Sequence, residues 1–210
     1  MKIEILYPEI CTLYGDKGNT MYLQKCLPDA EFVTTGLNEK PLFLRENIDM
    51  VYMCSMSEKS QELVLDRLMQ YKEDIAACMK DGKALFLLVG NSMELLGDYI
   101  KREDGTRVTG LGVVPGMYSV RQAPNRFNTL IKAKFNDMTL IGYTSRFAHT
   151  YGIPENMTFC KVEIGQGSNP DTMNEGICRN RVIATYIHGP LLIQNPDFVH
   201  YLLERLDAPM

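Results

Sequence analysis

Short apolar runs alternate with amphipathic segments through the first half of the chain. Residues 2–6, 31–34, 50–54 and 84–89 have the composition of β-strands. The segment Ala84–Val89 is apolar throughout, which is typical of a central parallel strand covered on both faces. Because helix-like segments separate these strands, the pattern predicts an α/β fold with a doubly wound, mainly parallel sheet.

Two helix-like segments lie between the predicted strands. One runs to about Leu27 from Asn19, a residue suited to capping a helix. The other is a long helix that Ser57 caps and Gly82 ends. Its apolar residues recur every three or four positions, as in a helix packed on a sheet. These residues are Val64, Leu68, Tyr71, Ile75 and Met79.

The second half of the chain predicts short strands with few helices between them. The strands cover residues 129–135, 138–143, 158–164 and 182–186. Asn136-Asp137 suits the turn of a hairpin between the first two of these strands. A final helix begins with Asn195 as its cap and Pro196 at its first position, and it runs to about Leu206.

Composition adds limits to this picture. The chain has 210 residues, of which 45% are hydrophobic and 23% charged, and its net charge is −4 at pH 7. We therefore expect one domain over residues 1–210, without a nucleic-acid partner and without a membrane span. The amino-terminal segment resembles a first strand and not a signal peptide, so a cytoplasmic location is expected.

The thiols and imidazoles give no metal-binding pattern. The six cysteines form no C-x-x-C pair, and the three histidines show no ligand spacing with them. We expect reduced thiols that mostly pack as small apolar groups, and neither a metal nor a cofactor.

The segment from Ala84 to Gly97 has the pattern of a buried strand, a sharp turn and a helix. Enzymes often mount a nucleophile at such a turn, beside the helix N-terminus. Here the turn carries Gly90, which has no side chain. Gly90 either occupies the position of a lost nucleophile or makes an ordinary tight turn, and Asn91 and Ser92 suit capping of the helix that follows.

Ligand sites in open α/β sheets lie beyond the carboxyl ends of the strands, which here follow Leu6, Cys54, Val89 and Tyr186. His188 follows the last of these strands and is a candidate general base. A loop histidine bonded to a backbone carbonyl is an equally good interpretation.

Two further segments could take part in binding. Arg126 could hold an α-carboxylate bidentately, or it could be an ordinary surface arginine. The loop from Leu13 to Asn19 could close over a ligand, or it could simply lead into a helix.

Four segments together resemble a known family. They are Leu6–Asn19, the Leu95-Leu96-Gly97 run after the turn, Asn125-Arg126 after Gly110–Gly112, and Thr185–Leu192 with Asn195. The chain resembles class I glutamine amidotransferases of the cobyric-acid-synthase type, and among them the glutaminase subunits of lipid II isoglutaminyl synthases. The resemblance spans nearly the whole chain and implies a flavodoxin-like three-layer sandwich.

The resemblance implies that ammonia is released from glutamine by a cysteine thiolate with a histidine as base. The ammonia would pass to a Mur-ligase-like, ATP-dependent synthetase that amidates a peptidoglycan precursor. In this pattern His188 is the retained base and Arg126 holds glutamine or another small amino acid. We also assign Asn91 and Ser55 to substrate binding. No acid that completes a triad is evident, and the resemblance implies that the partner could supply one.

The chain departs from the family pattern at three places. The position of the nucleophilic cysteine falls on Gly90, and Cys54–Ser57 replaces a glycine-rich loop that helps to form the oxyanion hole. The stretch Gly142–Arg146 replaces a Gly-Phe-Glu-Asn-His-like motif. Removing the nucleophile of a triad hydrolase lowers turnover roughly 10⁶-fold.

Three hypotheses follow from this pattern. The first is an amidotransferase-like subunit that no longer hydrolyses glutamine. The second is an active glutaminase with a displaced nucleophile, either Cys54 or Ser92. The third is a small-molecule-binding module without the ancestral partner.

Overall fold

The computed structural model describes residues 1–208, and residues 209 and 210 of the predicted domain lie outside the described residues. Over this range the strands form a nine-stranded and a four-stranded sheet. The strands are β1 (Lys2–Leu6), β2 (Glu31–Thr35), β3 (Met50–Met53), β4 (Leu85–Val89), β5 (Tyr99–Lys101), β6 (Arg107–Thr109), β7 (Tyr118–Arg121), β8 (Phe127–Phe135), β9 (Met138–Arg146), β10 (Ala148–Tyr151), β11 (Thr158–Ile164), β12 (Asn174–Arg179) and β13 (Val182–Thr185). The α-helices are α1 (Lys17–Cys26), α2 (Glu58–Met69), α3 (Lys72–Asp81), α4 (Leu191–Gln194) and α5 (Pro196–Arg205), and short 3-10 helices cover Leu13–Gly15, Leu42–Leu44, Gly90–Leu96 and Glu155–Met157.

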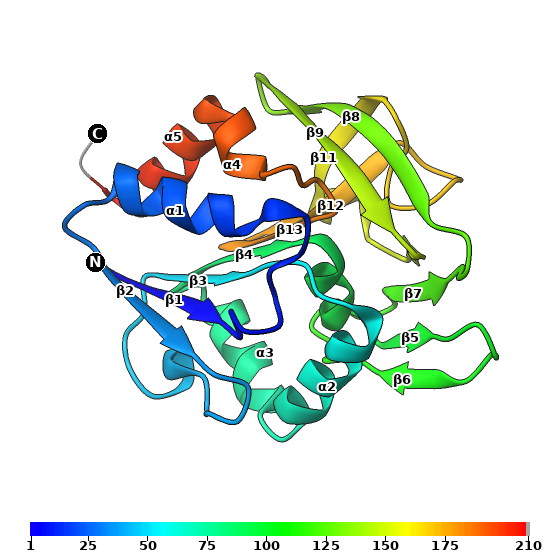
Figure 1. Cartoon of the computed structure of the whole chain (residues 1–210), viewed down its shortest axis with the longest axis horizontal. Helices are drawn as coiled ribbons and strands as arrows, with labels where there is room; N and C mark the ends of the chain where they lie inside the picture. The colour runs from blue at the N-terminus through cyan, green and yellow to red at the C-terminus, as the bar shows by residue number, and fades with distance from the viewer. Residues whose placement is uncertain (209–210) are drawn as a thin grey trace.

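The parallel part of the large sheet confirms the predicted doubly wound α/β fold. Its strand order is β2-β1-β3-β4-β13, and all four neighbouring pairs run parallel. Helices α1, α4 and α5 cover one face of this part, and α2 and α3 cover the other (Figure 1). Every residue of β4 is buried, as its unbroken apolar sequence predicts.

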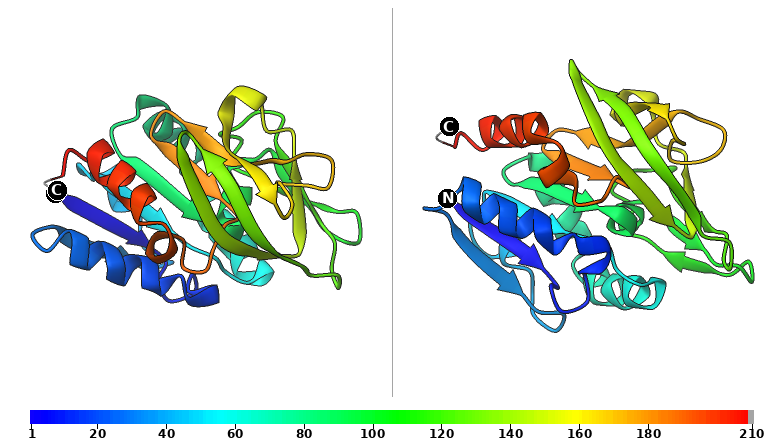
Figure 2. Two further views of the ribbon diagram at one scale, coloured as in Figure 1. Left: turned by 90° about the horizontal axis from the view of Figure 1, so that it is seen from above. Right: turned by 45° about the horizontal axis from the view of Figure 1, so that its top comes forward.

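The sheet continues beyond β13 through β12, β11, β8 and β9, and each of these pairs is antiparallel. The long β8–β9 hairpin forms the end of the large sheet opposite to β2, and its turn projects from the molecule in the right-hand view of Figure 2. The sequence predicted strands at β8, β9, β11 and β13 but none at β12.

The four-stranded sheet was not predicted. Its order is β10-β7-β5-β6, and each of its strands has only three or four residues. Strands this short carry too little of the alternating pattern to be read from the sequence.

The long helix expected between Ser57 and Gly82 is two helices, α2 and α3. Ser57 caps α2 as predicted, because its hydroxyl accepts a hydrogen bond from the Ser60 backbone N–H at 3.1 Å. Gly82 ends α3 with a positive φ of 65°. The break at Gln70 and Tyr71 leaves the apolar spacing intact, so the stripe of apolar residues did not reveal it.

Asn195 stands at the N-cap position of α5 with Pro196 at the first position of the helix, as predicted. The side chains of Asn19 and Asn195, however, bond other groups and not the helix N-terminus. α1 begins at Lys17, and the Asn19 amide lies inside it, where it donates to the Tyr52 hydroxyl at 2.9 Å. The Asn195 amide bonds both backbone groups of Ile141 at 2.8 Å. Each amide is buried, so pairing with distant polar groups outweighs local capping.

The turn after β4 also differs in detail from the prediction. The segment Gly90–Leu96 is a 3-10 helix and not an α-helix. The sharp strand-to-helix turn is nevertheless present, and it places Gly90 directly at the carboxyl end of β4.

Candidate functional site

The loops that follow four parallel strands meet at one edge of the sheet. The loop after β1 contributes Asp16, the loop after β3 contributes Ser55, and the loop after β13 contributes His188. Gly90 follows β4 and lies against Ser55 and His188. The expectation that ligand-site candidates gather at these strand ends thus matches the geometry.

Gly90 has the backbone of a nucleophile turn but no room for a side chain. Its φ is +72°, a conformation that L-residues seldom adopt. A Cβ atom built at Gly90 would lie 2.0 Å from Ser55 Oγ and 2.9 Å from His188 Cε1. The Ser55 side chain therefore occupies the volume that a nucleophile at position 90 would need.

Ser55 joins His188 and Asp16 in a buried chain of hydrogen bonds. The Ser55 hydroxyl donates to Asp16 Oδ2 at 2.9 Å, and it lies 3.1 Å from His188 Nδ1. The Ser145 backbone N–H donates to His188 Nε2 at 3.3 Å. Since Nε2 accepts a hydrogen bond, a neutral His188 ring carries its proton on Nδ1 and donates it to Ser55.

The hydrogen bonds of this cluster run in a different direction from those of a hydrolase triad. In a triad, the histidine accepts the proton of the nucleophile through one nitrogen and is oriented by an acid through the other. Here His188 Nδ1 faces both Ser55 and Asp16, the latter at 3.9 Å, and the remaining nitrogen is engaged by a backbone N–H. The hydrogen bonds run from His188 through Ser55 to Asp16, so His188 is poorly placed to take a proton from Ser55.

Burial perturbs both titratable groups of this chain. It lowers the pKa of His188 from 6.5 to about 4, so the ring is neutral near pH 7. It raises the pKa of Asp16 to about 6, although the hydrogen bond from Ser55 opposes the change. Among residues 1–208, Asp16 Oδ1 has no hydrogen-bond partner, which is consistent with the high cost of keeping this carboxylate charged.

Aromatic rings cover the cluster. The Tyr14 ring lies 4.7 Å from the His188 ring between centroids, and the Tyr143 ring lies 5.5 Å away. Ser55 and His188 are each 1% exposed and Asp16 is 0% exposed. The three polar side chains are thus closed off from bulk solvent.

The two candidate replacement nucleophiles are bonded to backbone carbonyls. The Cys54 thiol donates to the Cys11 carbonyl, and burial raises the pKa of that thiol well above its usual value. The Ser92 hydroxyl lies 2.8 Å from the Val89 carbonyl oxygen, to which it can donate. Both side chains are buried.

Asn91 holds the loop Cys54–Ser57, which replaces the glycine-rich loop of the family pattern. Its Oδ1 accepts from the Met56 backbone N–H at 3.0 Å, and its Nδ2 donates to the Met56 carbonyl at 2.8 Å. The Met56 N–H is therefore already paired and is not free for a substrate oxygen. Asn91 and Ser55 were both predicted to bind substrate. In the structure Asn91 bonds Met56, and Ser55 bonds Asp16 and His188.

Arg126 lies apart from the buried cluster. Its side chain is exposed, and its guanidinium stacks on the Phe147 ring at 4.5 Å from the centroid. In the altered stretch 142–146 a different arginine is buried. Arg146 is 3% exposed, and its Nη2 donates to the Gly167 carbonyl at 2.6 Å.

Asp16 is the member of the cluster that the sequence did not reveal. No acid was evident near His188, and the loop Leu13–Asn19 was interpreted either as a segment that closes over a ligand or as the lead into a helix. The structure places Asp16 immediately before α1, where it turns inward to Ser55 and does not cap the helix. Its place inside a segment that carries the family resemblance was the one available signal.

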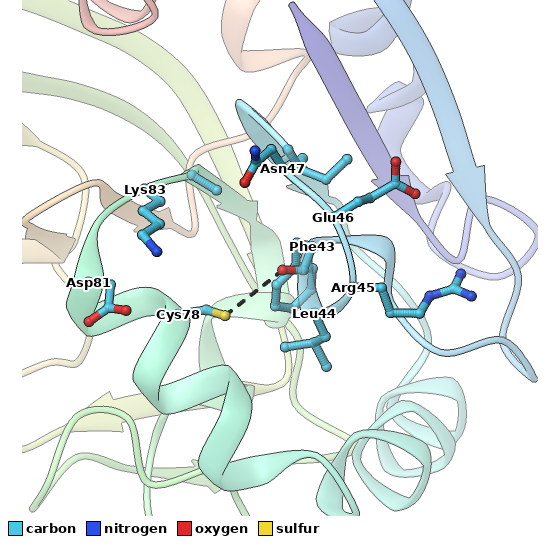
Figure 3. A pocket seen from close by; sticks show the side chains of 10 residues that line it. Phe43, Leu44, Arg45, Glu46, Asn47, Cys78, Asp81 and Lys83 are labelled. Atoms are coloured by element: carbon cyan, nitrogen blue, oxygen red, sulfur yellow. Dashed lines mark hydrogen bonds between the residues drawn. The ribbon is translucent and has the colours of Figure 1, made fainter.

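Other features lie away from this site. A cavity of about 250 Å³ opens at the amino ends of β3 and β4, where the Cys78 thiol points toward the Phe43 carbonyl (Figure 3). Within the described range, 1–208, no three His, Cys, Asp or Glu side chains gather as a metal site. None of the helices in the part that the structure describes has the length and apolar character needed to cross a bilayer.

A doubly wound sheet with a nucleophile turn and a histidine at neighbouring strand ends defines a protein of the class I glutamine amidotransferase fold. The chain belongs to the family of CobB/CobQ-like glutamine amidotransferase domains, which residues 2–196 match. This family was expected from the sequence, and the match confirms it.

Two curated relatives carry the same description, subunit GatD of a glutamine-hydrolysing lipid II isoglutaminyl synthase. The protein of Streptococcus pneumoniae is 27% identical over 207 residues, which are 97% of this chain and 79% of the relative. That of Staphylococcus aureus is 26% identical over 196 residues, which are 92% of this chain and 79% of the relative.

Solved structures support the fold. A crystal structure described as a glutamine amidotransferase has a TM-score of 0.64 and 14% identity, with 98% of this chain and 99% of that chain covered. A glutamine amidotransferase from Thermotoga maritima has a TM-score of 0.59 and 12% identity, with 100% of this chain and 86% of that chain covered. At such low identity these likenesses concern the fold alone.

Proposed function

We propose that this chain is the amidotransferase-like subunit of a complex that amidates the peptidoglycan precursor lipid II, and that it has lost cysteine-dependent glutamine hydrolysis. Its partner is a Mur-ligase-like, ATP-dependent synthetase, and the complex draws on free ammonia. The lipid II part of the proposal is supported by the two curated relatives, which align over almost the entire chain.

The loss of hydrolysis is supported most directly by the contact between Gly90 and Ser55. A missing nucleophile alone could be a single substitution in an otherwise working site. Here Ser55 Oγ lies 2.0 Å from where the Cβ of a nucleophile would be, so the space has been filled as well. The Met56 N–H is likewise paired with Asn91. The Ser55-Met56 loop and the Gly90-Asn91 turn thus both lack features that a covalent intermediate would need, which supports the loss of hydrolysis.

The alternative of a displaced nucleophile has less support. An attacking thiol must be deprotonated, and burial raises the pKa of Cys54. Ser92 lies against the Val89 carbonyl and would need a base to remove its proton. A base that serves either residue must accept a proton, whereas His188 Nε2 is engaged by Ser145 and its Nδ1 faces Ser55.

An exposed apolar patch favours a protein partner. Leu130, Ile141 and Ile164 come from β8, β9 and β11 and surround Lys132 on one face of the antiparallel part of the sheet. They are 74%, 48% and 59% exposed. Exposed apolar groups that cluster on a sheet are typical of interaction sites.

The partner is tested with Leu130→Glu in the full chain. Co-purification with the Mur-ligase-like synthetase of the same organism is expected for the wild type and is expected to be lost in the variant. Met21→Glu on α1 is the matched control, because Met21 is also apolar and 54% exposed. Equal loss in both variants, or no complex with the wild type, would leave a lone binding module as the better description.

The nitrogen source is tested separately on the complex. Amidation of lipid II with ATP is expected to proceed with ammonium chloride and to stop when glutamine is the only nitrogen source. Equal rates with glutamine would refute the loss of hydrolysis and leave the partner assignment intact.

Remaining parts of the proposal rest on the sequence. We propose a single cytoplasmic domain that needs no metal or cofactor. Arg126 remains proposed as the contact for a carboxylate, and glutamine or another small amino acid remains the proposed small ligand.

A further inference from the structure

A row of stacked tyrosines crosses the four-stranded sheet. Tyr99 on β5, Tyr118 on β7 and Tyr151 on β10 are register partners on adjacent strands. Their rings are nearly parallel, with centroids 5.2 Å and 5.5 Å apart. The Arg107 guanidinium lies 4.1 Å from the Tyr99 centroid and closes one end of the row. Tyr151 forms the other end, because β10 is an edge strand of this sheet.

A cavity of about 240 Å³ lies beside Tyr151. Its far wall is a loop, residues 168–173, that runs along the outer edge of β10. The Thr150 N–H donates to the Ser168 carbonyl at 2.9 Å, and Asn169 Nδ2 donates to the Thr150 carbonyl at 2.7 Å. Tyr118 stacks on one face of the Tyr151 ring, and the cavity borders β10 together with the loop along the edge of the strand that is opposite to β7.

The loop that forms the far wall is held in place by its own contacts. Asn169 Oδ1 accepts from the Asp171 backbone N–H at 2.9 Å, and Ser168 Oγ accepts from the Gly176 backbone N–H at 3.1 Å. Ser168 and Asn169 are both buried. Such a wall does not have to be ordered when a ligand enters, which favours binding.

The lining carries polar side chains as well as the tyrosine. Asp171 and Asn174 line the cavity and bring a carboxylate and an amide to it. Asp171 is exposed, so its carboxylate is accessible to a ligand.

We propose that this cavity binds one ring of a neutral carbohydrate, with an apolar face of the sugar on Tyr151 and its hydroxyl groups on Asp171 and Asn174. A sugar ring has both properties that this lining calls for, because it presents C–H groups on its faces and hydroxyl groups around its rim. The cavity is smaller than the roughly 300–1,000 Å³ of pockets that hold drug-sized ligands, which suits a single ring.

Charge favours a sugar over a phosphate or a nucleotide. Asp171 is the charged side chain that lines the cavity, and no lysine or arginine accompanies it there among the described residues. A carboxylate repels anions and accepts hydrogen bonds from hydroxyl groups. The inference does not depend on whether the Gly90 site is active.

Titration of the full ¹⁵N-labelled chain with N-acetylglucosamine, and separately with glucose, tests this proposal. Backbone amide signals of residues 150–153 and 168–176 are expected to shift with at least one of the two sugars, with a dissociation constant in the millimolar range. If neither sugar shifts these signals at high millimolar concentration, the proposal is wrong.

Variants of the two end tyrosines give the matched control. Tyr151→Leu is expected to weaken binding about tenfold, because it removes the aromatic face at the cavity. Tyr99→Leu removes the equivalent ring at the far end of the row and is expected to leave the affinity unchanged. Equal weakening in both variants would refute a site at Tyr151.

The carboxylate provides a second test that does not rely on the tyrosine row. Asp171 is exposed, so Asp171→Asn is expected to fold normally and to weaken binding severalfold. Asp137→Asn, at an exposed position in the β8–β9 turn, is the control. Unchanged affinity in Asp171→Asn would contradict the proposed contact with sugar hydroxyl groups.

Discussion

A cysteine introduced at position 90 is expected to destabilise the protein unless the Ser55 side chain is also removed. In Gly90→Cys the new Cβ would lie 2.0 Å from Ser55 Oγ and 2.9 Å from His188 Cε1, so the Ser55 and His188 side chains must shift. Overpacking of this kind costs about 1–3 kcal/mol. The φ of +72° adds about 1–2 kcal/mol for a residue with a side chain. The free energy of unfolding is therefore expected to fall by about 2–5 kcal/mol.

A second glycine separates these two contributions. Gly105 has a φ of +86°, and a Cβ there would meet no atom within 4 Å. Gly105→Cys therefore carries the backbone cost without the overlap. Urea denaturation is expected to show that Gly90→Cys loses about 1–3 kcal/mol more than Gly105→Cys.

The double variant Ser55→Gly with Gly90→Cys tests the overlap itself. Removing the Ser55 side chain removes two of the three closest contacts, so the two substitutions are expected to be less destabilising together than the sum of each alone. The coupling energy in a double-mutant cycle is expected to be about 1–3 kcal/mol. The reasoning is refuted if the two effects simply add, or if Gly90→Cys is no less stable than Gly105→Cys. Labelling by a glutamine-analogue electrophile then shows whether the double variant has regained a working thiol.

Three further predictions concern groups around the site. His188 is expected to titrate near pH 4 in an NMR titration of its ring signals, and a pKa near 6.5 would show that the ring is not shielded from solvent. Glu94 is buried in the 3-10 helix that begins at Gly90, and its carboxyl group accepts hydrogen bonds from Gln61 and Tyr186. Burial raises its pKa from 4.5 to about 7, so the stability that protonated Glu94 contributes is lost as the pH rises from about 4.5 to 7. Glu94→Gln should flatten the curve of stability against pH over that range, and parallel curves for wild type and variant would contradict the shift. Asn91→Ala is expected to lower the free energy of unfolding by about 1–3 kcal/mol because the Met56 backbone loses both partners, whereas the exposed Asn156→Ala should change it little; equal effects in urea denaturation would contradict this role.

The parallel half of the fold was predictable because its signals are local and strong. The unbroken apolar run of β4 fixed a central strand, and Ser57 and Gly82 marked the ends of the α2–α3 segment. The features that the sequence did not predict depend on contacts between distant residues. The amide of Asn19 bonds Tyr52 across 33 positions, and nothing in the neighbouring sequence shows that partner.

The site was partly predictable for the same reason. Sequence patterns placed Gly90 and His188 at strand ends, which the doubly wound sheet then brings together. The role of Ser55 could not be inferred, because it depends on the 2.0 Å separation between its hydroxyl and an absent Cβ atom. Asp16 was missed because its loop looked like a helix start, and only the fold turns its carboxylate toward Ser55.

Ammonia release from glutamine by the purified full chain, alone and with its synthetase, tests the central claim most directly. We predict a rate equal to that of His188→Ala and of the protein-free control. Glutamine-dependent ammonia release that disappears in Cys54→Ala, Ser55→Ala or Ser92→Ala would contradict the claim, because it would show that one of these side chains performs the attack.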